Sequence, residues 1–201
     1  TTRRRVKRRW LGGLQMKLLL ENWNRFLTED DSIFNYIINP DEKTFLTRVP
    51  FGEMKNIESS QQKTGFKPQG LWYGCGDEWL KWSRRELPSD YINSMKHIYK
   101  IELNYATINE KDAYDRVLKL STPEEMSDFD YEYGTENYSD RGIDWKRVSI
   151  DYGGIEICPY QQDEAKFLNW YYSWDVASGC VWDKGAVKIV EWLSSKQGLT
   201  K

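Results

Sequence analysis

The sequence lacks the segments and motifs that mark several large classes of protein. No run approaches the length of about eighteen apolar residues that a membrane-spanning helix needs, and the basic start is not followed by the long apolar stretch of a signal peptide. Neither Gly-x-Gly-x-x-Gly nor a Walker loop is present, which disfavours the phosphate-binding loops built on those motifs. We therefore expect a soluble protein without a membrane partner.

Cysteine and histidine are scarce. Cys75, Cys158 and Cys180 are an odd number without a repeated spacing, and His97 is the only histidine. This pattern predicts reduced thiols in an intracellular, cytoplasmic protein, and it predicts no metal site because a Cys3His zinc site would need all four residues and no Cys-x-x-Cys pair exists. Catalysis by a Ser-His-Asp or Cys-His set would depend on His97, which we expect to be an ordinary strand-edge residue.

Aromatic residues are in excess. They make up 15% of the 201 residues, with ten Trp and thirteen Tyr, while apolar residues at 39% and charged residues at 30% are typical of one globular domain. Trp and Tyr combine a large apolar area with a polar group, so they suit a core or a ligand platform. An aromatic-rich core is the more common use.

The first fifteen residues are strongly basic. They carry six basic and no acidic residues, so without them the net charge falls from −2 to −8, with 23 basic against 31 acidic residues. We expect residues 1–15 to be a disordered or non-native extension and residues 16–201 to be a single globular domain. A basic arm can bind nucleic acid, but the acidic remainder argues against a nucleic-acid groove on the domain.

The hydrophobic pattern predicts an α+β fold. Helices or helical turns are predicted over 16–28, 77–87, 121–134, 143–152 and 162–174, with a last helix carrying Ala186, Ile189, Val190 and Leu193. Strands are predicted within 41–51, 70–74, 97–104, 116–120, 153–158 and 178–183, and residues 52–66 are expected to be a long loop. Because the strands do not alternate with long helices, we expect a mixed, mostly antiparallel sheet with short peripheral helices.

Two charged residues stand alone in strand-like runs. Arg48 is the only charge in "FLTRV", where an arginine fork suits a phosphate or a structural ion pair. Glu156 lies between Ile155 and Ile157, so it takes the opposite face of the strand, which we expect to meet solvent or a cleft. In a cleft, a glutamate can stabilise an oxocarbenium-like centre or activate an attacking hydroxyl.

Residues 67–82, "KPQGLWYGCGDEWLKW", suggest a ligand platform. Trp72 and Tyr73 lie in a short strand bounded by Gly70, Gly74 and Gly76. The glycines would leave room for a flat ligand beside the aromatic rings, such as a nicotinamide, a nucleobase or a sugar.

The order and spacing of these segments resemble the ADP-ribosyltransferase-like fold over about residues 44–160. "FLTRV" is similar to the early strand of that family, "KPQGLWYG" to the strand that lines the nicotinamide pocket, and "YGGIEI" to the strand with the catalytic glutamate. The Ser-Thr-Ser of one branch is replaced here by "LWYG", and Gly154 stands where Gln or Glu is common, two residues before Glu156.

The resemblance implies an NAD-dependent mono-ADP-ribosyltransferase with an unknown acceptor. NAD would be the co-substrate and no metal would be needed. Arg48 would bind the diphosphate, Trp72 and Tyr73 beside Gly70 would flank the nicotinamide, and Glu156 would be the catalytic residue.

Two other classes stay open. A carbohydrate-binding or carbohydrate-hydrolysing protein would stack sugars on tryptophan and pair carboxylates, with Glu156 and Asp151, or Asp175 and Asp183, as candidates. A non-enzymatic phage or structural protein would use its aromatics as core, with Arg48 and Glu156 on unconnected surfaces. "MKLLLENWNRFL" and "WYYSWDVASGCVWD" are similar to segments of phage and marine metagenomic proteins.

Overall fold

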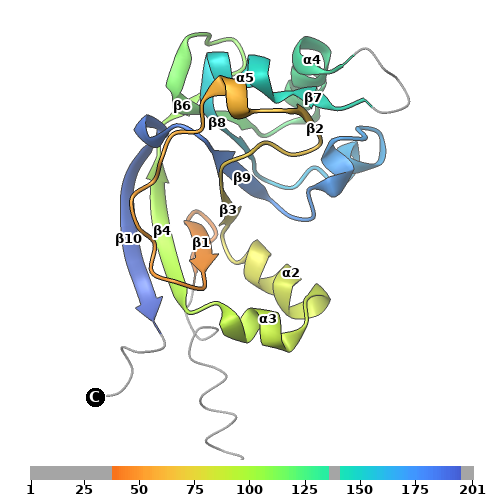
Figure 1. Cartoon of the computed structure of the whole chain (residues 1–201). Coiled ribbons are helices and arrows are strands. Elements are labelled where there is room, and N and C mark those ends of the chain that lie inside the picture. Colours follow the sequence, from red (N-terminus) through yellow and green to blue (C-terminus); the bar gives the residue numbers. More distant parts are fainter. Residues whose placement is uncertain (1–37, 136–140, 196–201) are drawn as a thin grey trace, which may run out of the picture. The chain divides into compact units, whose positions relative to one another are not determined.

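The structure, a computed structural model, describes residues 38–135 and 141–195 (Figure 1). The basic residues 1–15 and the helix predicted over 16–28 lie outside the described residues. Most of the described strands form one eight-stranded sheet in the order β10-β4-β1-β3-β9-β8-β6-β5, and β2 pairs with β7 separately. The strands are β1 (Lys43–Thr47), β2 (Thr64–Gly65), β3 (Leu71–Cys75), β4 (His97–Leu103), β5 (Tyr105–Ala106), β6 (Ala113–Leu120), β7 (Ile143–Asp144), β8 (Tyr152–Ile157), β9 (Ser178–Val181) and β10 (Val187–Ser195).

The sheet is mixed and mostly antiparallel. β6 pairs in parallel with β5 and with β8, whereas the other pairs among the described strands are antiparallel. The expected α+β class and the mostly antiparallel sheet are therefore confirmed. All six strands predicted from the sequence are present, each within a few residues of its expected limits.

Short helices connect the strands. The described helices are α2 (Glu78–Glu86), α3 (Ser89–Ser94), α4 (Pro123–Tyr133) and α5 (Trp145–Asp151), with single 3-10 turns at η1 (Ser59–Gln61), η2 (Glu164–Lys166), η3 (Tyr171–Ser173) and η4 (Lys184–Ala186). The start of α4 follows directly from its sequence: Thr122 accepts a hydrogen bond from the backbone of Glu125, whose side chain bonds back to Thr122, and Pro123 takes the first helical position. None of the described helices combines the length and apolar character required to cross a lipid bilayer.

Two helix predictions are wrong. The last predicted helix is strand β10, which pairs with β4 at the end of the sheet, and its β-branched Val187, Ile189 and Val190 favour this extended form. The segment 162–174, for which a helix is predicted, forms the two short 3-10 turns η2 and η3 rather than a continuous helix. In both segments, tertiary pairing and packing override a pattern that suits a helix.

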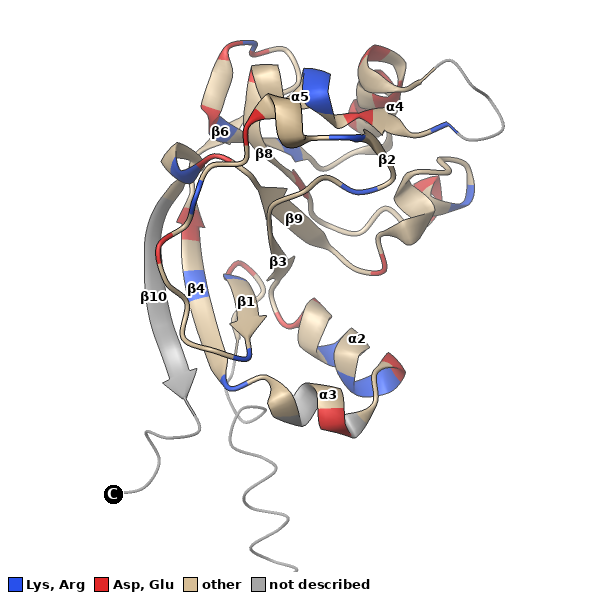
Figure 2. Ribbon diagram, in the orientation of Figure 1, with Lys and Arg blue, Asp and Glu red and all other residues tan. Residues whose placement is uncertain are grey.

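The central strands are apolar on both faces. Leu118, Ile155 and Cys180 belong to one core cluster, and their strand neighbours Val117 and Val181 belong to another. Helices α4 and α5 lie over the β6–β8 part of the sheet (Figure 1) and bury their apolar residues in the first cluster. Figure 2 shows charges on the helices, on the loops and on strands such as β4, while β3 and β9 carry none.

Gly179 allows one side chain to cross the middle of the sheet. It lies between Tyr73 of β3 and Glu156 of β8 in the strand register. A Cβ atom at residue 179 would lie only 2.3 Å from the Tyr73 hydroxyl and 2.7 Å from the Ile155 carbonyl oxygen. The absence of a side chain on β9 therefore lets the Tyr73 ring pass over this strand.

We expect Gly179→Ala to destabilise the protein by about 1–3 kcal/mol, because the added methyl group overpacks the space that the Tyr73 ring occupies. The matched control is Gly52→Ala, where a Cβ meets nothing within 4 Å. Urea unfolding followed by circular dichroism measures both. Equal midpoints for the two variants would contradict this role of Gly179.

Candidate functional site

A cavity lies where the sheet divides between β1 and β3. These strands pair only at Lys43–Cys75 and Thr44–Gly74, whereas β1 pairs with β4 along its whole length. If the ladder continued, Phe45 would lie opposite Tyr73. Instead the strands separate, and a cavity of about 290 Å³ opens between them. This volume is at the lower end of ligand pockets, which span about 300–1,000 Å³, so it suits a ring more than a whole dinucleotide.

Six aromatic residues are among those that line this cavity. They come from β1, β3, the helices α2 and α3, and the segment before β9, and they are Phe45, Trp72, Tyr73, Trp79, Tyr91 and Trp174. The rings of Trp72 and Trp174 meet edge to face with centroids 4.9 Å apart. Such walls bind flat or cationic groups through ring faces and edges.

Charged groups flank the aromatic wall. The Lys67 ammonium lies 5.5 Å from the centre of the Trp72 ring and 3.8 Å from the Asp175 carboxylate, and both residues line the cavity. The Arg48 guanidinium lies 4.7 Å from the centre of the Tyr91 ring, so the exposed Arg48 stands beside the cavity although it does not line it. Both signs of charge are thus available to a ligand bound here.

The Glu156 side chain is completely buried and lies on the same face of the sheet as Tyr73. The hydroxyls of Tyr73 and Tyr105 donate to its Oε2 atom at 3.1 and 2.9 Å. The Lys43 ammonium lies 3.5 Å from Oε1, within ion-pair range, but Oε1 accepts no hydrogen bond. An ionised carboxylate without these partners would be very costly to bury.

The expectation that Glu156 faces solvent or a cleft is wrong. The alternation with Ile155 and Ile157 is present, but all six residues of β8 are buried because both faces of this central strand are covered. Tyr73 is also among the residues that line the cavity, and its hydroxyl donates to the Glu156 carboxylate. Tyr105, 38% exposed, covers the carboxylate from another strand.

The tyrosine hydroxyls beside Glu156 are held protonated. Burial, followed by the negative charge of Glu156, raises the pKa of Tyr73 well above its usual 10.0. The same two causes, in the same order, raise the pKa of Tyr105. Both hydroxyls therefore act as hydrogen-bond donors to the carboxylate at neutral pH.

Two cysteines join β3 to the end of β8. Cys75 and Cys158 form a disulfide with Cα atoms 6.6 Å apart, and Cys180 is a buried free thiol. The prediction of reduced thiols is therefore wrong for Cys75 and Cys158. With a sequence separation of 83 and no spacing motif, only the strand register brings the two together.

The structure gives other roles to several predicted site residues. A Cβ at Gly70 would lie 2.5 Å from the Val181 carbonyl oxygen, so close packing against β9, rather than a ligand, accounts for this glycine.

Asp183 accepts hydrogen bonds from the side chain of Asn56 and the backbone of Gly185, and it shares none of these partners with Asp175. Asp175 lines the cavity beside Lys67, whereas Asp183 is not among the lining residues.

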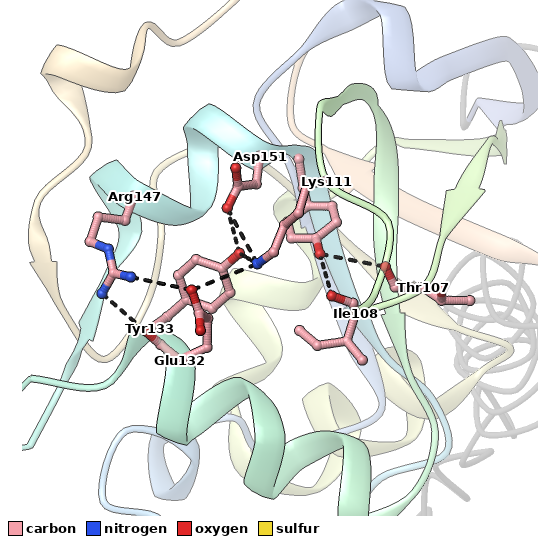
Figure 3. A network of polar contacts seen from close by, with 8 residues as sticks. Thr107, Ile108, Lys111, Glu132, Tyr133, Arg147 and Asp151 are labelled. Atoms are coloured by element: carbon pink, nitrogen blue, oxygen red, sulfur yellow. Dashed lines mark hydrogen bonds and ion pairs between the residues drawn. The ribbon is translucent and has the colours of Figure 1, made fainter.

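Asp151 belongs to a separate polar network (Figure 3). It accepts a hydrogen bond from the Tyr133 hydroxyl at 2.6 Å and lies 3.6 Å from the Lys111 ammonium, while Glu132 pairs with Lys111 and Arg147. This network ties α4 and α5 to the loop before β6. Asp151 and Glu156 have different partners, so they do not form the carboxylate pair expected for glycoside hydrolysis.

Comparison with known proteins gives no family. No family model, curated protein or solved structure matches this chain. The ADP-ribosyltransferase-like fold stays a prediction, and the cavity and the buried glutamate are the features from which a function is inferred.

Sequence reasoning missed Lys43 and Tyr105, which complete the surroundings of Glu156. Lys43 shares a face of β1 with the buried Phe45, so a lone lysine at a core-facing strand position was the available signal. Tyr105 reaches the glutamate from β5 across β6, and no local pattern reports such a contact. The cavity also recruits Tyr91 and Asp175, which the sequence did not connect with Trp72.

At neutral pH, we expect Tyr73→Phe to lower the free energy of unfolding by about 1–3 kcal/mol, because the buried carboxylate loses a hydrogen-bond donor. Tyr172→Phe, at a side chain that is 78% exposed, is the matched control. Denaturant unfolding measures both. A Tyr73→Phe midpoint equal to that of the control would contradict the support of Glu156 by Tyr73.

The raised pKa of Tyr73 also predicts how Tyr73→Phe changes the stability at alkaline pH. Below pH 10.0 Tyr73 is protonated in both the folded and the unfolded chain, so its contribution to stability is complete there. Above that pH the unfolded chain loses the proton first, and stability falls by about 1.4 kcal/mol per pH unit for this one group until the folded pKa is reached. We expect a shallower loss of stability between pH 10 and 11 in Tyr73→Phe than in the wild type, as measured by urea unfolding. Parallel curves would contradict the raised pKa.

Proposed function

We propose that this protein binds a flat, ring-bearing ligand in the cavity between β1 and β3, and that the nicotinamide end of NAD is the first ligand to test. The observation that carries the proposal is the group of six aromatic residues around one cavity of about 290 Å³. A pyridinium ring is flat and positively charged, and aromatic faces attract such cations. The Asp175 carboxylate at the wall adds an attraction of the same sign.

The surroundings of the cavity also suit the rest of a dinucleotide. Arg48 stands beside Tyr91 with an exposed guanidinium, a group that binds phosphate oxygens in pairs. Lys67, paired with Asp175 at the cavity, offers a second positive charge. The ring would therefore enter the cavity while the diphosphate stays outside it.

ADP-ribosyl transfer is the reaction to test after NAD binding. It would require Glu156 to meet the ribose, but this carboxylate is completely buried, is not among the residues lining the cavity, and accepts hydrogen bonds from Tyr73 and Tyr105. The described geometry thus supports ligand binding more directly than catalysis by Glu156. A Glu156→Gln variant with unchanged NAD turnover would remove the catalytic assignment.

We expect calorimetry on the full chain to show saturable binding of NAD in its oxidised form and about tenfold weaker binding of the reduced form, whose ring is uncharged. A loss of one cation–aromatic contact of about 1–2 kcal/mol gives a change of this order. Tryptophan fluorescence gives a parallel signal because Trp72, Trp79 and Trp174 line the cavity.

Two variants and a control locate the site. Tyr91→Ala and Arg48→Ala are each expected to weaken binding about tenfold, whereas Tyr131→Ala, at an 86% exposed side chain of α4, is expected to leave it unchanged. No heat and no fluorescence change at millimolar NAD would reject the nucleotide. The same titration with simple sugars then tests the carbohydrate alternative, which the tryptophan wall also favours.

A further inference from the structure

Three metal-binding groups meet at one end of β8. Cys75, Cys158 and Glu156 place one donor atom each within 4.8 Å of the others, and this is the one such group among the described residues. We propose that, after reduction of the Cys75–Cys158 disulfide, these residues bind a divalent, thiolate-preferring metal ion such as zinc. The proposal is independent of the aromatic cavity and of NAD.

The strand register builds this cluster from two rows of residues that run across β3, β9 and β8. Tyr73, Gly179 and Glu156 form one row across β3, β9 and β8. The next row is formed by Cys75, Ala177 and Cys158, and the Cys75 backbone donates to the Ala177 carbonyl. Residues two apart on a strand share a face, so Glu156 and Cys158 lie on the same side of the sheet.

Glu156 has a free acceptor for a metal ion. Its Oε1 atom is buried and accepts no hydrogen bond, while Oε2 is held by Tyr73 and Tyr105. A carboxylate that is oriented through one oxygen can ligate an ion through the other, and hydrogen bonds of this kind orient metal ligands in known sites. In the disulfide form the Oε1 atom accepts no hydrogen bond, and a bound metal ion would give it a partner.

The backbones of Cys75 and Cys158 stand far apart for a disulfide-bonded pair. Their Cα separation of 6.6 Å is near the wide end of the range of about 4.4–6.8 Å that disulfides span. Thiolates that ligate zinc at about 2.3 Å stand further apart than bonded sulfurs, so a wide pair requires little backbone movement. Cys158 is partly exposed, which gives solvent and metal a path to the site.

The charges balance in both forms. In the disulfide form, the Glu156 carboxylate faces the Lys43 ammonium at 3.5 Å. In the metal form, two thiolates and the carboxylate carry three negative charges, which the divalent ion and Lys43 neutralise. Lys43 is also the cross-strand neighbour of Cys75, where a positive charge favours the thiolate.

The chemistry has two steps. A small dithiol reductant delivers two electrons and two protons to the disulfide, which breaks the sulfur–sulfur bond and gives two thiols while the reductant becomes a cyclic disulfide. The metal ion then displaces one proton from each thiol, so two protons pass to the buffer for each ion bound.

Cobalt binding by the full chain tests the proposal. Divalent cobalt reports thiolate ligation through near-ultraviolet charge-transfer absorption, and all three cysteines of the chain lie among the described residues. We expect the reduced protein, separated from the reductant without oxygen, to bind one cobalt ion with this absorption, and zinc to displace it. The oxidised wild type is expected to show none. Equal spectra for the two forms, or no absorption from the reduced form at millimolar cobalt, would overturn the site.

Variants then identify the ligands. Cys158→Ser is expected to remove the thiolate absorption typical of the pair, and Glu156→Gln, which keeps the side-chain shape, is expected to weaken binding at least tenfold. Cys180→Ser, the matched control on the opposite face of β9, is expected to bind as the wild type does. Unchanged affinity in Glu156→Gln, or loss in Cys180→Ser with circular dichroism unchanged, would contradict the three-residue site. Where a variant does not fold, the comparison of reduced and oxidised wild type decides.

Discussion

A buried carboxylate at the centre of the sheet constrains much of this structure. Glu156 has no exposed surface, and the cost of burying its charge is offset by two tyrosine hydroxyls and a lysine drawn from three other strands. To reach it, the Tyr73 ring must cross β9, and Gly179 is the residue that permits the crossing. The buried charge therefore requires β1, β3 and β5, none of which neighbours β8 in the sheet, to bring these side chains within reach of it.

The separation of β1 from β3 opens the aromatic-lined cavity in the same part of the sheet as Glu156. Tyr73 belongs to both features, since it is one of the residues lining the cavity and its hydroxyl donates to Glu156. Cys75 lies two residues further along β3, so one short strand connects the cavity, the glutamate and the cysteine pair.

The aromatic excess serves two purposes that differ in their hydrogen bonding. The buried indoles of Trp145, Trp170 and Trp182 each donate to an oxygen atom elsewhere in the chain, as a core tryptophan requires. Trp72 and Trp79 are only partly buried and turn toward the cavity. The core and the ligand platform are therefore adjacent, with Trp174 belonging to both.

The sequence by itself determined the α+β class, most strands, the start of α4 and the isolation of Glu156 between two isoleucines, because these depend on residues close together along the chain. It misassigned β10, whose form depends on pairing with β4, and it placed Glu156 at a surface, because alternation separates the faces of a strand without saying what covers each. Only the tertiary structure decided the partners of Glu156, the joining of Cys75 to Cys158 and the opening beside Trp72. Each depends on contacts between distant strands, and their register has no signature in local sequence.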